Sequence, residues 1–232
     1  MISKLIKKIM YPHNYSSDAL IEYLRSLGAT VGEDVYFYSP IKTIVDTANA
    51  RFIEIGNNVQ ITSDVKILAH DYSFFVLANA YNSLARKQRK TVIGNNVFIG
   101  VGATILMGSD IGDNVIIGAG AVVSGKVESN SVYAGNPAVK ICTLEKHFNS
   151  NKKHFIDSAK CYAEGFKKKN GRLPHPEEMI AYRALFCDRK TLSEYAQKEH
   201  FRGITAEAKK NMSMPEFENM FSSVEELMNY KG

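Results

Sequence analysis

The fold is decided by residues 93–128, which read IGNNVFIGVGATILMGSDIGDNVIIGAGAVVSGKVE. The stretch repeats with a period of six. A branched aliphatic residue begins each hexad: Ile93, Ile99, Ile105, Ile111, Ile117 and Val123. A second series of small or aliphatic residues follows four positions after each of these: Val97, Ala103, Ser109, Val115, Ala121 and Val127.

The even spacing of both series indicates extended chain. In a helix, six residues turn by about 240°, so the leading residues would point in three directions. In a strand, residues at even separations face the same side. The stretch is therefore predicted to form short strands with one apolar face, which is buried by stacking in a solenoid. Ile93 and Ile111 are three hexads apart, which predicts three-sided coils.

The same phase extends towards the N-terminus, more loosely. Its leading residues there are Val31, Phe37, Thr43, Asn49, Ile55, Ile61 and Ile67, and Ile41, Thr47 and Ile53 belong to the second series. The signature I-G-[ND]-N-V begins at Ile55, Ile93 and Ile111. Glycine and asparagine tolerate left-handed backbone angles, so this signature predicts the corners of the coils.

A loop is predicted to leave the solenoid at residues 70–91. Ile67 and Ile93 are 26 positions apart, which is not a multiple of six. The loop is more apolar than is usual for a loop exposed to water. Its apolar residues are Tyr72, Phe74, Phe75, Val76, Leu77 and Tyr81. We expect it to pack on another part of the assembly, such as a second subunit.

Helical segments flank the repeats. Residues 1–30 are predicted to be an N-terminal helical cap, with one helix starting after Ser16 and ending at Gly28. Residues 1–10 are amphipathic; we favour packing on protein over contact with a membrane. The solenoid covers residues 31–142. Residues 143–232 are predicted to be a helical extension, with a helix ending at Asn170-Gly171 and a capping box at Thr191–Glu194.

Composition narrows the class of protein. The 232 residues are 45% hydrophobic and 23% charged, which is typical of globular proteins. There is no apolar stretch of roughly 18 to 20 residues and no signal peptide, so we expect a cytoplasmic location. The net charge of +5 is too small to indicate nucleic-acid binding. Three widely spaced cysteines predict free thiols rather than a metal site.

His70 is the candidate catalytic residue, because it stands where the regular coil gives way to the loop. A histidine suits general-base chemistry, and loops on rigid scaffolds often hold catalytic groups. The alternative is a hydrogen-bonded structural histidine. Asp71 is not expected to orient the ring, because neighbouring residues in a strand face opposite sides. The other five histidines lie outside the repeats, and no metal site is predicted.

Two segments carry a resemblance to a known family. They are IEIGNNVQITSDVKILAHD at residues 53–71, and residues 91–141, which close with AGNPA at 134–138. Together they resemble the hexapeptide-repeat acyltransferases, above all the maltose and galactoside O-acetyltransferase branch. The resemblance implies a mainly β fold, a left-handed parallel β-helix. It also implies a homotrimer with active sites between subunits, and acetyl-CoA as the acyl donor.

The resemblance also implies roles for individual residues. His70 would be the general base, and the backbone N–H near Val101 would hold the oxyanion. Phe98, Gly100, Val101 and Ala119 would line the pantetheine arm of the donor, and Ser124 would lie near its nucleotide.

The chain departs from the family pattern at two places. The family often has arginine where this chain has Val139, so Lys140 or Lys126 is expected to contact phosphate. The galactoside branch has an asparagine on an earlier coil, and a gapped alignment puts Ser39 there. A simple turn serine is the alternative for Ser39.

These observations lead to a functional hypothesis: an acetyl-CoA-dependent O-acetyltransferase acting on a hydroxyl of a sugar or saccharide, in surface-polysaccharide synthesis. One alternative is an N-acyltransferase acting on an amino sugar, a nucleotide-linked sugar or an amino acid. Another is a non-catalytic structural or binding solenoid. The γ-type carbonic anhydrases share this fold but need three histidines on zinc, and only His70 lies in the repeat region.

Overall fold

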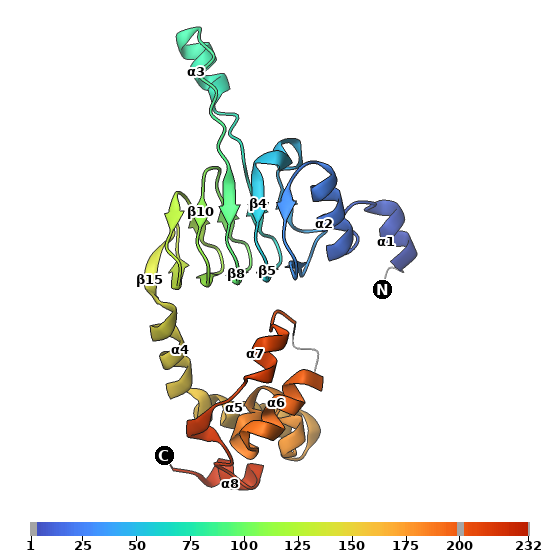
Figure 1. The fold of residues 1–232 in the computed structure, drawn as a ribbon, viewed down its shortest axis with the longest axis vertical. Helices are drawn as coiled ribbons and strands as arrows, with labels where there is room; N and C mark the ends of the chain where they lie inside the picture. Colours follow the sequence, from blue (N-terminus) through green and yellow to red (C-terminus); the bar gives the residue numbers. More distant parts are fainter. Residues whose placement is uncertain (1–3, 199–201, 232) are drawn as a thin grey trace. The chain divides into compact units, whose positions relative to one another are not determined.

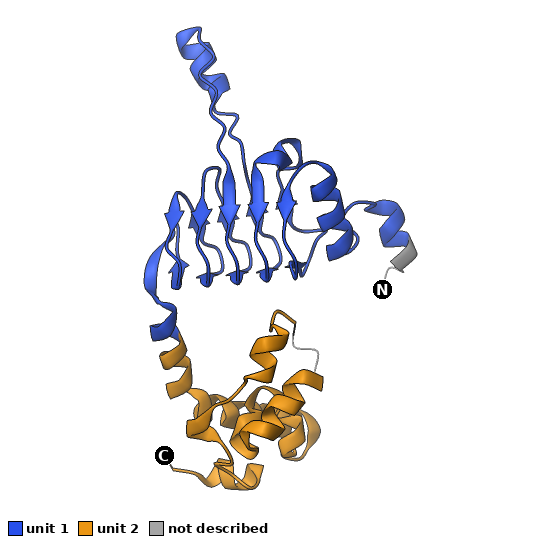
Figure 2. Ribbon diagram, viewed as in Figure 1, with its two compact units in different colours: residues 1–147 blue, residues 148–232 orange. Residues whose placement is uncertain are grey.

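The computed structural model describes residues 4–198 and 202–231. The chain forms two compact units, Met1–His147 and Phe148–Gly232 (Figure 2). Within the described ranges, no helix combines the length and apolar character needed to span a membrane.

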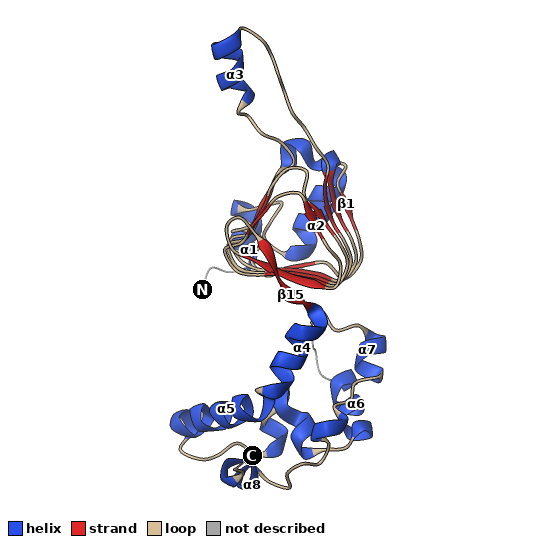
Figure 3. Cartoon of the chain, turned by 90° about the vertical axis from the view of Figure 1, so that its left-hand side faces the viewer, coloured by secondary structure: helices blue, strands red, loops and turns tan. Residues whose placement is uncertain are grey.

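The first unit is the left-handed parallel β-helix that the resemblance implies, and its coils are three-sided in cross-section, as the repeats predict (Figure 3). We name its faces sheets A, B and C, and its edges by the sheets that meet there. Sheet A contains β1 (Thr30–Val31), β4 (Ile53–Ile55), β7 (Thr91–Ile93), β10 (Asp110–Ile111) and β13 (Lys126–Val127). Sheet B contains β2 (Tyr36–Phe37), β5 (Val59–Ile61), β8 (Val97–Ile99), β11 (Val115–Ile117) and β14 (Ser131–Ala134), and antiparallel β15 (Val139–Thr143) ends it. Sheet C contains β3 (Ile44–Val45), β6 (Lys66–Ile67), β9 (Thr104–Ile105) and β12 (Val122–Val123).

The leading residues of the hexads form the core, as predicted. Ile61, Ile99 and Ile117 are paired in register on sheet B, and all three are 0% exposed. Ile93 and Ile111 stack in the same way on sheet A. Each inward side chain therefore packs on its equivalents in the coils above and below.

The A–B edge explains the I-G-[ND]-N-V signature. Asn58, Asn96, Asn114 and Asn130 have left-handed φ values of 54°, 53°, 57° and 56°. Their side-chain amides hydrogen-bond from coil to coil at 2.9, 2.8 and 3.0 Å. A Cβ on Gly94 would lie 2.7 Å from the carbonyl oxygen of Gly112. The glycine is therefore required by the close approach of successive coils.

The predicted hexad phase is wrong between Phe37 and Ile55. The inward residue of β3 is Val45, eight positions after Phe37, and Thr43 occupies the second-series place instead. Val45 and Ile55 are ten positions apart, because the 3₁₀ segment η1 (Thr47–Phe52) is inserted between them. The two insertions together amount to one hexad, so the phase is restored at Ile55. Thr47, predicted to face inward, is exposed.

The predicted helix after Ser16 is confirmed as α2 (Ser17–Ser26), which lies at the β1 end of the coils (Figure 1). The Ser16 hydroxyl accepts a hydrogen bond from the Ala19 N–H at 3.2 Å. Leu24 is fully buried in the core of the β-helix, and Gly28 follows the helix with φ of +92°. The helix therefore covers the first coil.

The amphipathic segment predicted at residues 1–10 forms α1 (Lys4–Met10). Residues 1–3 of that prediction lie outside the described residues. Ile9 is 72% exposed and Met10 58% exposed. The described part of this chain therefore does not provide the packing that we favoured for these two side chains.

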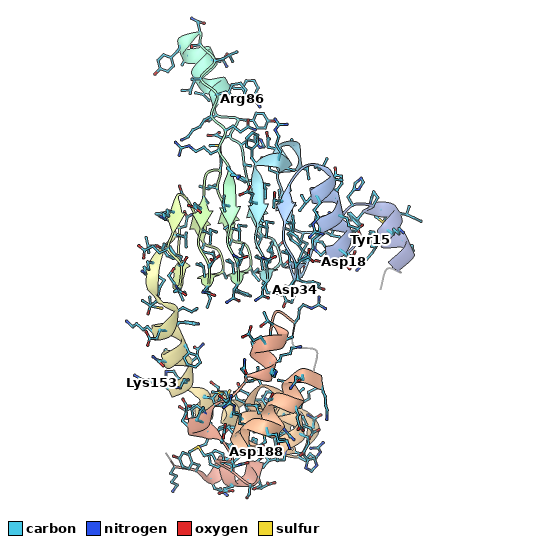
Figure 4. All side chains as sticks on the ribbon, in the orientation of Figure 1. Tyr15, Asp18, Asp34, Arg86, Lys153 and Asp188 are labelled. Atoms are coloured by element: carbon cyan, nitrogen blue, oxygen red, sulfur yellow. The ribbon has the colours of Figure 1, made fainter. Side chains whose placement is uncertain are left out.

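The predicted loop is an arm that extends away from the β-helix and carries α3 (Phe74–Tyr81) (Figure 1). The helix has no buried residue. Side chains project from the arm, among them Arg86 (Figure 4). The Arg86 guanidinium lies 5.5 Å from the centroid of the Phe74 ring. We call residues 71–90 the excursion.

The second unit is helical, as predicted for the C-terminal extension. After α4 (Leu144–Lys153) come α5 (Phe155–Asn170), η2 (Pro176–Glu178), η3 (Ile180–Phe186), α6 (Arg189–Lys198), α7 (Ala206–Lys210), η4 (Pro215–Phe217) and α8 (Val224–Asn229). The predicted stop at Gly171 is confirmed by its φ of +74°. The capping box at Thr191 is wrong, because α6 begins earlier and the Asp188 carboxylate accepts from the Thr191 N–H at 2.7 Å.

Core stacking predicts a large effect for Ile105→Ala. Ile105 on β9 is 0% exposed, so its truncation should reduce the free energy of unfolding by about 2–5 kcal/mol. Ile44→Ala on β3 is the matched control, because Ile44 is 53% exposed, and it should change that energy by less than about 1 kcal/mol. Denaturant titration followed by circular dichroism measures both. Equal losses in the two variants would contradict the stacked core.

Candidate active site

His70 lies on the C–A edge, three residues after the end of β6 and at the base of the excursion. It forms an antiparallel bridge with Gln88, on the returning strand of the excursion. Its side chain is 20% exposed, and the Tyr72 ring lies edge-on to it with 4.4 Å between ring centroids. The imidazole is therefore held at the junction of the rigid coils and the excursion, with part of the ring accessible.

The partner of His70 is Asp46, which comes from the preceding coil. Its Oδ2 contacts the His70 Nδ1, and its side chain is only 2% exposed. Asp46 also accepts hydrogen bonds from the Ala69 N–H at 3.1 Å and from the Asn49 side-chain amide at 3.2 Å. Burial opposes ionisation of Asp46, but the hydrogen bonds from His70, Asn49 and Ala69 outweigh it and hold the pKa of the carboxyl below its usual value.

The ionised Asp46 fixes the tautomer of the imidazole. A carboxylate only accepts hydrogen bonds, so the Nδ1 of His70 carries the proton, as assigned from the network. The lone pair of Nε2 then remains available, and none of the described residues hydrogen-bonds to that atom. A histidine in this state can accept a proton from a substrate.

Two further residues extend the network from Asp46 to the excursion. Asn49 lies in η1, is 6% exposed, and donates to Asp46 through both its backbone N–H and its amide. The Gln88 side-chain amide donates to the Oδ1 of Asn49. The orientation of the imidazole is therefore linked to the position of the returning strand of the excursion.

Sequence reasoning missed Asp46, Asn49 and Gln88. With an uninterrupted phase, Asn49 would face the core and Asp46 would face solvent. The correct register places Asp46 beside β6, where its N–H donates to the Ile67 carbonyl at 3.0 Å. Asp71 does not contact the imidazole; its carboxylate accepts from the Ser73 N–H at 2.6 Å and from the Ser73 hydroxyl at 2.9 Å.

A second group of predicted residues lies on the B–C edge. A Cβ on Gly100 would lie 2.5 Å from the backbone nitrogen of Ala119, so these two residues stack directly. Val101 is 52% exposed, and its carbonyl accepts from the Gly120 N–H at 2.8 Å. In the described part of the chain, the Val101 N–H has no acceptor. Phe98, 43% exposed, precedes this corner on the outer face of sheet B.

The remaining predicted residues are dispersed. Ser124 follows β12 on the C–A edge, and Lys126 is exposed at the start of β13. Lys140 lies on β15 and pairs with Glu128 at 2.5 Å, which raises the pKa of the lysine. Ser39 forms a turn, where its carbonyl accepts from the N–H groups of Lys42 and Thr43. The turn interpretation thus accounts for the contacts of Ser39.

The two principal groups lie on different edges of one chain. His70 and Asp46 lie on the C–A edge, whereas Val101 and Ala119 lie on the B–C edge, and sheet C separates the two edges. In residues 4–198 and 202–231, no cluster of three histidine, cysteine or acidic side chains could hold a metal ion.

The hydrogen bonds to Asp46 predict a pH-dependent contribution to stability. Because the folded-state pKa is below the ordinary 3.8, the stabilisation is complete above pH 3.8 and is lost as the pH falls through the folded value. Asp46→Asn should therefore destabilise the protein at neutral pH, with a difference from wild type that shrinks as the pH falls below 3.8. Denaturant titrations at several pH values test this, with Asp18→Asn as an exposed control. A difference independent of pH would contradict the prediction.

Comparison with known proteins assigns the family. Residues 90–125 match the family model "Bacterial transferase hexapeptide (six repeats)". The protein CapG of Staphylococcus aureus is 41% identical over 146 residues, which cover 63% of this chain and 81% of CapG. WbbJ of Escherichia coli K12, whose name assigns it to lipopolysaccharide biosynthesis as an O-acetyl transferase, is 32% identical over 46% of this chain and 60% of its own length.

Among solved structures, a maltose O-acetyltransferase from Clostridium difficile 630 is 30% identical, covering 59% of this chain and 83% of that protein, with a TM-score of 0.39. The hexapeptide repeats, the register of the coils and the identity with CapG all indicate the same family. The chain belongs to the bacterial hexapeptide-repeat transferase family and is an acyltransferase of that family.

Proposed function

We propose that the protein is an acetyl-CoA-dependent O-acetyltransferase that acts on a hydroxyl of a sugar or saccharide in the synthesis of a surface polysaccharide. The observation that carries this proposal is the buried Asp46 carboxylate on the Nδ1 of a partly exposed His70. A buried carboxylate that orients one histidine nitrogen leaves the other nitrogen as a base. The name of WbbJ supports the acceptor class.

The proposed reaction is direct transfer within a ternary complex. The Nε2 of His70 takes the proton from the acceptor hydroxyl while its oxygen attacks the thioester carbonyl carbon. The N–H of Val101 donates to the oxyanion that forms on the carbonyl oxygen. Collapse of this intermediate breaks the carbon–sulfur bond, and the leaving thiolate receives the proton from His70. Asp46 stabilises the imidazolium between these two proton transfers.

The proposed assembly is a homotrimer with shared active sites. One chain carries the base on the C–A edge and the exposed N–H of Val101 on the B–C edge, so a site that uses both needs two subunits. The excursion supports this assembly. It exposes Phe75 by 58%, Val76 by 69%, Tyr81 by 74% and Leu84 by 77%. Apolar surface of this kind marks a contact with protein.

The donor is proposed to lie along the cleft between two subunits. Its pantetheine arm would pass Phe98, Gly100, Val101 and Ala119, where small side chains let the backbone approach it. Ser124 and Lys126 would lie near the nucleotide. Lys126 is the better candidate for phosphate, because the ammonium of Lys140 is already paired with Glu128.

His70→Ala is expected to reduce turnover by a factor of roughly 100 to 10,000, because the hydroxyl then loses its general base. The measurement is thiol release from acetyl-CoA in the presence of a saccharide acceptor. CoA should still raise the melting temperature of the variant, and His154→Ala, at an exposed histidine outside the β-helix, should react at the wild-type rate. Wild-type turnover in His70→Ala would falsify the assignment of the base.

Shared sites predict complementation between two inactive variants. His70→Ala removes the base from one edge, and Ala119→Trp blocks the donor channel on the other. Co-expressed in equal amounts, they should assemble trimers in which about a quarter of the sites combine an intact His70 edge with an intact Ala119 edge. Each mixed trimer has one such site in three, so mixed trimers isolated through two different tags should recover about a third of wild-type activity. If the mixed trimers recover no activity, each active site lies within one chain.

The acceptor class is tested with a library of saccharides, amino sugars and amino acids, incubated with enzyme and acetyl-CoA and analysed by mass spectrometry. The proposal predicts a mass increase of one acetyl group on hydroxyl acceptors, in a linkage labile to mild base. Acetylation of amines alone would favour the N-acyltransferase alternative. If the protein neither binds CoA nor transfers an acetyl group to any acceptor, the result favours a non-catalytic solenoid.

A further inference from the structure

The second unit contains a cavity of about 250 Å³ that belongs to no part of the proposed active site. It lies between η3, α6 and the segment around α7, and the described residues that line it lie between Ile180 and Met214 in the sequence. The lining is mostly apolar and includes Ile180, Leu192, Ile204, Met212 and Met214. A cavity with this lining favours an apolar ligand.

One charged side chain, Arg183, contributes to the lining of this cavity. It is 15% exposed, and its Nε and Nη1 are buried without a hydrogen-bond acceptor in the described chain. A carboxylate oxygen of Glu177 is 3.4 Å from Nη1 and belongs to a side chain that is 72% exposed. The guanidinium lies over the Tyr195 ring, 5.5 Å from its centroid.

This environment is unusual for a guanidinium. Arginine carries five N–H donors and stays charged, and a charge withdrawn from water normally makes hydrogen bonds. Stacking on an aromatic ring and one long contact with an exposed carboxylate compensate this loss only in part. An acidic group of a ligand in the cavity would lie on the accessible part of the guanidinium and would offset the charge that burial withdraws from water.

We propose that this cavity binds an amphiphilic monoanion, a molecule with an apolar body and one carboxylate. The apolar lining selects the body, and Arg183, the one cation among the described lining residues, selects one negative charge. An engineered apolar cavity of about 150 Å³ holds benzene, so this one accommodates roughly ten non-hydrogen atoms. A medium-chain or aryl-alkyl carboxylate has this size. The inference does not depend on the proposed transferase function.

Octanoate, with ten non-hydrogen atoms, is the probe, and 1-octanol is its neutral counterpart. Binding to the full-length protein is followed by the NMR signals of ¹³C-labelled methionine methyl groups. Met212 and Met214 line the cavity, whereas Met107 lies in the β-helix and reports unspecific effects. Octanoate should shift the signals of Met212 and Met214 in a saturable manner, with a dissociation constant of about 1 mM or lower. Octanol should bind about tenfold more weakly.

Two variants of the protein separate recognition of the carboxylate from burial of the ligand's alkyl chain. Arg183→Gln should weaken octanoate binding by about tenfold and leave octanol binding unchanged. Arg189→Gln, the same change at an exposed arginine that does not line the cavity, should leave both unchanged.

The comparison of the two ligands on the wild-type protein needs no variant, so it decides the question even if Arg183→Gln fails to fold. Equal affinities for octanoate and octanol would overturn the proposal, as would shifts that spread equally to Met107. The absence of any shift at Met212 and Met214 at millimolar octanoate would overturn it too.

Discussion

The structure depends on the vertical stacking of like side chains. Each coil of the β-helix places an isoleucine or valine directly on the equivalent residue of the next coil, as in Ile61, Ile99 and Ile117. Because the stacked side chains share one shape, the coils can approach closely enough for asparagine amides to bond from coil to coil on the A–B edge. Close approach also removes the space for a Cβ at Gly94 and Gly100. The repeat of six is therefore a packing requirement. The asparagines and glycines at the corners are in turn required by the close approach of the coils.

The proposed catalytic residues lie where this stacking is interrupted. The insertion η1 moves Asn49 off the coil, and the excursion leaves the coil just after His70. The two interruptions meet on the C–A edge, where Asp46, Asn49 and Gln88 form one hydrogen-bonded chain to the imidazole. The regular coils provide rigidity around the site. In the proposed trimer, the uninterrupted B–C edge of a neighbour would supply the backbone N–H that faces this base.

Much of the β-helix could be predicted from the sequence, because branched side chains at a period of six all face one side of an extended chain, and stacking buries that side. The start and end of α2 and the end of α5 could be predicted from Ser16, Gly28 and Gly171. The phase near Val45 could not, because insertions of two and four residues add to a full hexad and leave no trace at Ile55. With the wrong phase, Asp46 is predicted to face solvent and is not recognised as the partner of His70. The place of His70 beside the excursion made it the candidate base, whereas Gln88 lies in a segment without periodicity that gives no signal in the sequence.

The central claim is that the base and the oxyanion donor of one active site come from two subunits. A crystal structure of the assembled protein with CoA tests it most directly. The account predicts the CoA sulfur in the cleft between neighbouring chains, close to the Nε2 of one chain's His70 and to the Val101 N–H of the next. A CoA molecule bound within a single chain, or at a distance from every His70, would contradict the account.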